Sequence, residues 1–283
     1  MIQRNYLQNA VLGGIAVVFA VAQTSPGRRE NGPLMARVIS VMTRNIAASD
    51  TGEVDGLPGE ASPAPQLPTL VVAPSKVATA LGAFQSAVRP LSHSRALGDA
   101  FRSYFAYKAA NPEQVRKPYL YFVDYGLPST TPRGYVFDME SLKILDGPFM
   151  VAHGRGSAPN REGIPTRFSN AYGSYATSLG LYLAQETYTF RGKSGGRRYS
   201  SMGLKLQGVS GGFNDNARAR KVVAHGAPYV TSTRAGKSEG CPAVEQSRAR
   251  KIIPALANGA MVFLFAPDES WMHRDPWVTA SAE

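Results

Sequence analysis

The run of short apolar segments that begins at Lys117 constrains the fold of this chain most strongly. Pro and Gly turns separate these segments, which is typical of β-strands joined by short connections. Strand after strand of this kind predicts a mainly β body of about 160 residues. Helical pattern within it is limited to about Asn216–Arg220 and Val244–Leu256. The predicted strands are Tyr119–Tyr125, Tyr135–Asp138, Phe149–His153, Leu179–Gln185, Tyr188–Arg191, Leu204–Leu206, Lys221–His225 and Met261–Phe265.

A small helical extension, residues 75–116, precedes the β body. Ser75 is suited to cap a first helix that runs to about Phe84. A second helix is predicted from about Ser94, and it must stop before Asn111-Pro112 because proline disfavours helix in the residue before it. Leu97, Phe101, Tyr104 and Phe105 share one face of this helix. We expect that face to pack on the β body.

The first 22 residues have the pattern of a secretory signal. Arg4 supplies a positive charge, Ala10–Ala22 is uncharged and apolar, and Ala20-Val21-Ala22 offers a cleavage site before Gln23. This predicts export, to the periplasm or cell envelope. An uncleaved N-terminal anchor is the alternative, although the apolar run is short for a membrane span.

The remaining segments outside the β body carry little chemistry. Residues 23–74 are rich in Pro and Ala and are predicted to be a disordered linker. The β body is expected to span residues 117–270, and residues 271–283 form a C-terminal tail.

The net charge of the chain, +11, gives a pI of about 9.8 and predicts attraction to anionic polymers. The sequence has no run of five basic residues and no aromatic-interleaved nucleic-acid motif. We therefore expect no nucleic-acid partner, and contact with a membrane only through the N-terminal segment.

Cys241 is the single cysteine of the 283 residues. An exported chain with one cysteine has no internal disulfide, which favours a reactive thiol over an inert buried one. His225 lies sixteen residues upstream, at the end of a predicted strand, and a helix is predicted to start just after Cys241. A helix N-terminus and a nearby base both favour a thiolate, so the sequence predicts a nucleophile and base pair.

The other histidines are weaker candidates. His153 also ends a predicted strand, so it and His225 are expected at one rim of the sheet. A zinc site made from both histidines and either a carboxylate or Cys241 is the alternative, but zinc sites usually contain a pair of ligands close in sequence. His93 and His273 have no such neighbours. We expect no metal and no cofactor.

Several motifs together resemble the YkuD-type murein L,D-transpeptidases, in particular the branch whose signature ends in Ser-x-Gly-Cys-Pro-Ala. The resemblance covers about residues 117–266. It rests on His225-Gly226, on residues 237–243 (Lys-Ser-Glu-Gly-Cys-Pro-Ala), on residues 151–157 (Val-Ala-His-Gly-Arg-Gly-Ser), on Phe168-Ser169-Asn170, on Gly173-Ser174 with Ser178-Leu179-Gly180, on Gly208 with Asn214, and on residues 219–226.

The resemblance implies an L,D-transpeptidase-like β-sandwich and a site for peptidoglycan stem peptides. Cys241 would attack the diaminopimelate carbonyl of a tetrapeptide stem, and His225 would act as the base. Gly226 would hold the imidazole tautomer, and the turn containing Ser238 and Gly240 would stabilise the oxyanion. The substrate contacts it implies are His153, Arg155, Ser169, Asn170, Ser178, Tyr229 and Arg234.

Two departures from the broader family pattern stand beside this resemblance. Glu239 replaces a histidine, and Pro242-Ala243 replace a residue that is often asparagine or arginine. The predicted function is an exported peptidoglycan L,D-transpeptidase that transfers the acyl group to an amine. Water as the acceptor would give an L,D-carboxypeptidase or endopeptidase instead, and a non-catalytic wall-binding module is a further alternative. A redox role would need a second cysteine.

Overall fold

The computed structural model describes residues 74–159 and 163–281, which belong to one compact unit. The predicted signal segment and nearly all of the predicted linker lie outside the described residues. None of the helices that the structure describes is long and apolar enough to span a membrane.

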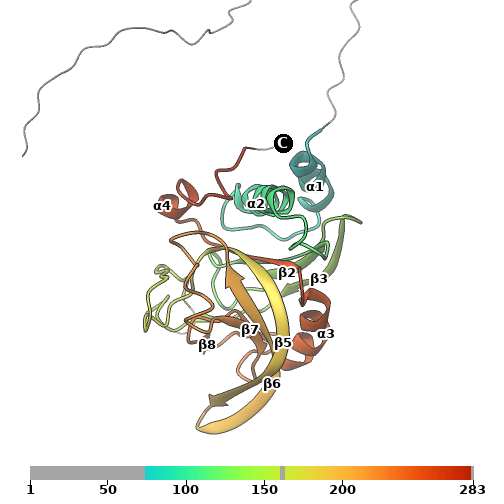
Figure 1. Cartoon of the computed structure of the whole chain (residues 1–283). Coiled ribbons are helices and arrows are strands. Elements are labelled where there is room, and N and C mark those ends of the chain that lie inside the picture. The colour runs from blue at the N-terminus through green and yellow to red at the C-terminus, as the bar shows by residue number, and fades with distance from the viewer. Residues whose placement is uncertain (1–73, 160–162, 282–283) are drawn as a thin grey trace, which may run out of the picture. The chain divides into compact units, whose positions relative to one another are not determined.

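A large sheet of eight strands organises the described chain (Figure 1). Its order is β3-β2-β1-β10-β5-β6-β7-β9, so β10, late in the sequence, lies between β1 and β5. The pairs β1/β10 and β7/β9 are parallel, and the other pairs are antiparallel. The strands are β1 (Tyr119–Asp124), β2 (Gly134–Asp138), β3 (Lys143–Phe149), β5 (Gly180–Ser194), β6 (Arg197–Gly208), β7 (Val223–Gly226), β9 (Ala243–Val244) and β10 (Met261–Phe265). Two further strands, β4 (His153–Gly154) and β8 (Lys237–Ser238), form a small parallel sheet.

The prediction of a mainly β body is confirmed, but some boundaries were wrong. Phe149–His153 is not one strand, because Phe149 ends β3 and His153 begins β4. The two predicted strands between Leu179 and Arg191 are one strand, β5, with an irregularity between Ala184 and Thr187. Asn216–Arg220 forms turns and not a helix.

The hairpin of β5 and β6 extends beyond the rest of the sheet (Figure 1). We call residues 187–202 the arm, because there β5 and β6 pair only with each other. Gly195 and Gly196 close its tip with φ values of 55° and 78°. Two successive positive φ angles match the hairpin turn that suits the twist of the strands.

The helical extension has the predicted form. Helix α1 (Lys76–Phe84) begins at Ser75, whose side chain accepts from the N–H of Ala78 at 3.2 Å. Helix α2 (Ala96–Ala110) ends before Asn111. Phe84 of α1 and Phe101 of α2 pack against each other and against Phe137 of β2, which ties both helices to the sheet.

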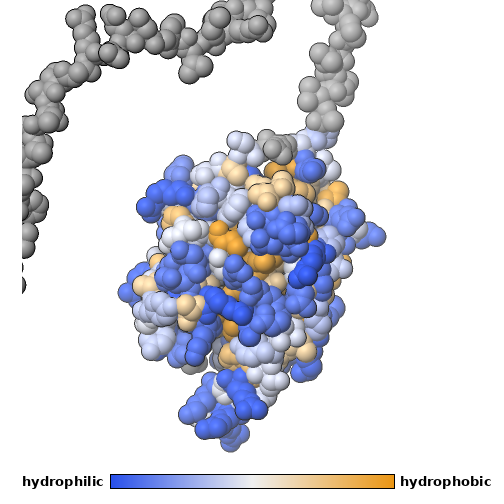
Figure 2. All heavy atoms as spheres, viewed as in Figure 1, coloured by the Kyte–Doolittle hydropathy of each residue, from blue (hydrophilic) through white to orange (hydrophobic). Residues whose placement is uncertain are grey.

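The last two helices lie near the C-terminus. Helix α3 (Gln246–Leu256) packs against β6 and β7 through a buried face that includes Ile252 and Ile253. Helix α4 (Glu269–Met272) begins at Asp268 and buries Trp271 against Phe263 and Phe265 of β10. The side of the molecule drawn in Figure 2 is mostly hydrophilic, with apolar side chains between the polar ones, and the arm at its lower end is strongly hydrophilic.

Candidate active site

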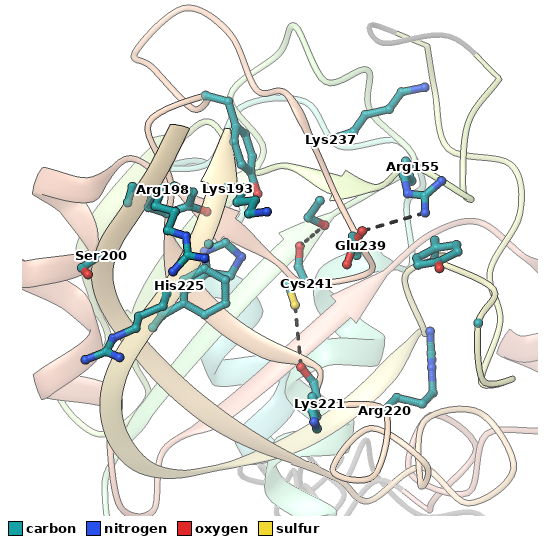
Figure 3. Close-up of a pocket in the computed structure, with 18 of the residues that line it drawn as sticks. Arg155, Lys193, Arg198, Ser200, Arg220, Lys221, His225, Lys237, Glu239 and Cys241 are labelled. Atoms are coloured by element: carbon teal, nitrogen blue, oxygen red, sulfur yellow. Dashed lines mark hydrogen bonds and ion pairs between the residues drawn. The ribbon is translucent and has the colours of Figure 1, made fainter. Parts of the chain in front are cut away.

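A cavity of about 1240 Å³ contains both Cys241 and His225 (Figure 3). Its walls come from the arm, from the loop that includes Tyr172 and Tyr175, and from the chain around β7 and β8. The volume exceeds that of most small-molecule pockets, and a peptide segment fits such a space.

Cys241 lies in the short connection between β8 and β9. Strand β8 pairs with β4 on one side, and β9 pairs with β7 on the other, so both ends of the connection are fixed. Ser238 tightens the turn, because its Oγ donates to the Cys241 carbonyl at 2.7 Å and accepts from the Gly240 N–H at 3.2 Å. The Gly240 N–H is thus occupied in holding the turn.

Gly240 is required in this turn for two reasons. Its φ of 117° lies in a region that L-residues rarely adopt. An added Cβ would also lie 2.9 Å from the Ala176 carbonyl oxygen. The backbone just before the cysteine therefore approaches the 169–178 loop closely.

The predicted helix N-terminus next to Cys241 is wrong. Helix α3 starts at Gln246, and β9 separates it from the cysteine. Residues 243–244 extend because they pair in parallel with His225 and Gly226. The helix dipole, which acts within its first turn, does not reach the thiol at this distance along the chain.

The thiol is buried and protonated in the resting structure. Its Sγ donates to the carbonyl of Lys221 at 3.9 Å, and Lys221 itself has a φ of 59°. Burial raises the pKa of Cys241 to about 11, whereas the Val223 N–H and the Arg220 charge act in the opposite direction. The expectation that the site already favours a thiolate is therefore not met.

His225 is held in a defined tautomer. Its Nδ1 donates to the Gly226 carbonyl at 3.0 Å, as a carbonyl can only accept, so Nε2 is left as a proton acceptor. The ring stacks on Phe190 of the arm, with centroids 3.8 Å apart and planes at 12°. Burial lowers the pKa of His225 to about 4, so the ring is neutral. Among the described residues, no hydrogen bond joins Sγ to this ring.

His153 occupies a different environment from His225. It is fully buried and is not part of the cavity lining. Its Nδ1 accepts from Nη2 of Arg133 at 3.0 Å, because a guanidinium only donates. Burial, with the charges of Arg133 and Lys237, lowers its pKa to about 3. The structure therefore places His153 with the buried Arg133 and away from the space where a substrate would lie.

The structure brings some of the predicted contacts together and separates others. Arg155, Tyr229 and Ser238 line the cavity with Cys241 and His225. Ser169 and Asn170 line a separate cavity of about 310 Å³ beside Trp271. Ser178 is buried and bonds to the hydroxyl of Tyr182. Arg234 is exposed in a turn and is not part of the cavity lining.

Arg220 is the residue that the sequence analysis missed. Its guanidinium donates to the Ser169 and Ala176 carbonyls at 2.7 and 2.8 Å, and to the hydroxyls of Ser174 and Ser178 at 3.2 and 3.3 Å. This half-buried side chain lines the cavity and holds the 169–178 loop against the cysteine turn. The position of Arg220, directly before the predicted strand Lys221–His225, was the one feature of the sequence that could have indicated its role.

The structure gives no support to a metal centre in the part of the chain that it describes. No three His, Cys, Asp or Glu side chains cluster there in a way that could hold a metal ion.

Comparison with known proteins places this chain in a family. Residues 92–265 match the model of the L,D-transpeptidase catalytic domain. The chain therefore belongs to the L,D-transpeptidase family, as the resemblance implied. The match starts 25 residues before the predicted start of the β body at residue 117, so it includes α2.

Solved structures from the same family are also similar to this chain. An L,D-transpeptidase from Mycobacterium smegmatis is 13% identical, with a TM-score of 0.30 over 53% of this chain and 59% of that one. One from Stackebrandtia nassauensis is 16% identical, with a TM-score of 0.33 over 61% and 67%. One from Xylanimonas cellulosilytica is 13% identical, with a TM-score of 0.31 over 72% and 100%. This chain thus spans a little over half of the first of these proteins. No curated protein matches the sequence.

Proposed function

We propose that this protein is an exported peptidoglycan L,D-transpeptidase with Cys241 as its nucleophile. The observation that carries the proposal is the pairing, in one cavity, of the single thiol with a neutral histidine whose Nε2 is free to accept a proton. Membership of the L,D-transpeptidase family supplies the substrate class, a peptidoglycan stem peptide.

The protonation states determine how the first step runs. With a thiol pKa of about 11 and a histidine pKa of about 4, a resting thiolate and imidazolium pair is disfavoured. The proton therefore moves from Sγ to Nε2 of His225 as Sγ attacks the diaminopimelate carbonyl. The turn N–H groups of Glu239 and Cys241 are the donors for the resulting oxyanion, because that of Gly240 already bonds to Ser238.

The remaining steps return the enzyme to its starting state. The tetrahedral intermediate collapses, the bond to the terminal D-amino acid breaks, and His225 gives its proton to the leaving amine. The product is a thioester between Cys241 and the diaminopimelate carbonyl. An amine from a second stem attacks this thioester, loses its proton to His225, and releases the cysteine as a thiol.

Two measurements test the proposal. A carbapenem should acylate the protein once, at Cys241, and Cys241→Ser should abolish both the adduct and turnover. His225→Ala should slow acylation by about 10²-fold or more, which is the scale of a lost general base. An adduct that forms at the same rate without His225 would show that another group is the base.

The acceptor is settled by product mass. With a defined disaccharide-tetrapeptide, a cross-linked dimer indicates transfer to an amine, and a tripeptide indicates hydrolysis. Binding without any product would favour a wall-binding module. Export is tested separately: the mature N-terminus of native protein should lie at or near Gln23, and a cytosolic protein with Met1 intact would contradict it.

A further inference from the structure

The walls of the reaction cavity carry a strong excess of positive charge. Seven of the lining residues are lysine or arginine, and one, Glu239, carries a carboxylate. The general basic character of the chain does not account for this, since 31 basic and 20 acidic residues occur in the whole sequence. A cavity so unbalanced is electrostatically complementary to an anionic ligand.

Arg155 forms one side of this basic lining, and contact with Tyr175 orients its guanidinium. Its guanidinium lies over the ring of Tyr175, 3.6 Å from the centroid. The nearest carboxylate, on Glu239, is 3.8 Å away, and both side chains are more than half exposed. Such an exposed pair is weak, so the N–H groups at the edge of the guanidinium can exchange Glu239 for a carboxylate of a ligand.

The arm forms the other side. Lys193 of β5 lies directly opposite Arg198 of β6, and both line the cavity. Like charges opposite each other in an antiparallel pair destabilise the hairpin. The arm itself has no acidic residue, and neither side chain forms an ion pair within the described part of the chain. A charge pair that destabilises an exposed hairpin is best explained by an anion that binds it.

Figure 3 shows how these groups are arranged around the nucleophile. Arg155 and Lys237 are drawn on one side of Cys241, and Lys193 and Arg198 on the other side, next to His225. A substrate in this cavity thus meets cations on both sides of Cys241.

We propose that this cavity selects acyl donors by their free carboxylates, and that it discriminates against stem peptides in which these carboxylates are amidated. This rests on the proposed function and specifies its substrate. Arg155 binds one of these two carboxylates of the acyl donor, and Lys193 with Arg198 binds the other. Amidation removes the charge, leaving the cations without a partner.

The test compares two synthetic disaccharide-tetrapeptides that differ only in amidation of the free diaminopimelate carboxylate and the glutamate α-carboxylate. Binding is measured first by calorimetry on Cys241→Ser, so the result does not depend on turnover. The free donor should bind about tenfold more tightly than the amidated one, the scale of a lost charged hydrogen bond. This preference should shrink with added salt.

Variants locate the selectivity. In the wild-type protein, Arg155→Gln and the double change Lys193→Gln/Arg198→Gln should each raise KM for the free donor several-fold, leave kcat nearly unchanged and reduce the preference for it. Arg250→Gln, which removes an exposed charge on α3 outside the cavity lining, is the matched control and should change neither constant. Alkylation of Cys241 by neutral iodoacetamide should be equal in all four proteins, and the arm variant should melt no lower than the wild type.

The outcomes separate this inference from the proposed function. Equal binding of the two donors overturns the inference even if the enzyme is an active transpeptidase. An effect of Arg250→Gln as large as that of Arg155→Gln also overturns it, because attraction would then depend on net charge alone. A clear preference in binding without any turnover supports the inference and contradicts the proposed function.

Discussion

The cysteine turn depends on a few residues that do not react. Gly240 lets the backbone turn, Arg220 holds the facing loop, and the Lys221 carbonyl accepts the thiol hydrogen bond. The Lys221 carbonyl lies 3.9 Å from Sγ, and Arg220 lies beside Gly240, so small changes there should alter reactivity more than stability.

Gly240→Ala tests the closest approach. The alanine would need a φ near 117° and would place Cβ 2.9 Å from the Ala176 carbonyl. We expect carbapenem acylation to fall by about 10²-fold, because small misplacement of a reacting group is that costly. Gly82→Ala in α1 is the control: its Cβ meets nothing within 4 Å, so it should stabilise the protein by about 0.5–1 kcal/mol and leave acylation unchanged.

Arg220 should influence the thiol through its charge as well as through the loop. Arg220→Gln removes a positive charge that lowers the pKa of Cys241. The rate of iodoacetamide alkylation at pH 8 should therefore fall, by roughly threefold to tenfold, and its pH profile should move to higher pH. Arg220→Lys should restore part of the alkylation rate, because it keeps the positive charge. It should not restore the rate of carbapenem acylation, because a lysine cannot make the four hydrogen bonds that the guanidinium donates to the 169–178 loop. Identical behaviour of the two variants would indicate a purely structural role.

At the scale of elements, the arm brings a side chain of the sheet into contact with His225. Phe190 reaches the histidine ring only because β5 continues past its neighbours into the arm. Phe190 helps to bury the His225 ring, and burial of this ring is the main reason for its low pKa.

Phe190→Ala should therefore change the acid limb of the activity profile. The exposed ring would regain a pKa near its ordinary value of about 6.5. A protonated ring cannot accept the thiol proton, so the variant should lose acylation below about pH 6.5, whereas the wild type keeps it down to about pH 4. Phe190→Tyr retains the aromatic ring and should behave like the wild type. Acid limbs at the same pH in all three proteins would contradict this account of the histidine.

The elements also show what the sequence could reveal. Local signals predicted α1 from its Ser75 cap, the end of α2 before Asn111-Pro112, and β10 from its apolar run. Elsewhere, the structure of a segment is determined by its pairing with a distant segment and not by its own pattern of apolar residues. Residues 243–244 look helical but extend along His225 and Gly226, and Ala152 also bridges to Ala243. The sequence of one segment alone does not predict which distant segment it pairs with.

For the candidate site, too, residues close in sequence could be predicted, and contacts between distant segments could not. Cys241, His225 and Gly226 could be predicted as a group because they lie close in sequence and carry recognisable chemistry, and Cys241 and His225 do share a cavity. Arg220 was missed because its partners, Ser169 to Ser178, lie 42 to 51 residues away. Ser169 and Ser178 were predicted to contact substrate; in the structure the Ser169 carbonyl and the Ser178 hydroxyl bond to Arg220.

At the scale of the whole molecule, the two buried histidines link stability to pH. The folded-state pKa of His153 is about 3 and that of His225 about 4, both below the unfolded value of about 6.5. The unfolded chain thus binds more protons in this range, so this part of the stability is present above about pH 6.5 and is lost as the pH falls. The raised pKa values of Asp99 and Asp124 act in the opposite sense.

His153→Gln isolates one contribution. A glutamine oxygen can accept from Arg133 as Nδ1 does, and it does not titrate. Between pH 7 and 4.5 the variant should lose about 2 kcal/mol less of its free energy of unfolding than the wild type. Denaturant titrations at several pH values measure this slope. A parallel slope in His153→Gln would show that His153 is not a source of acid sensitivity.

The position of β10 has a consequence for how the chain is made. The ribosome synthesises this strand after every other strand of the sheet, yet β10 is the one that joins β1, β2 and β3 to β5 and the strands around Cys241. A nascent chain that ends before Met261 lacks the strand that pairs with both β1 and β5. The strands beside Cys241 and His225 therefore become continuous with β1, β2 and β3 only once β10 has been made and inserted between β1 and β5.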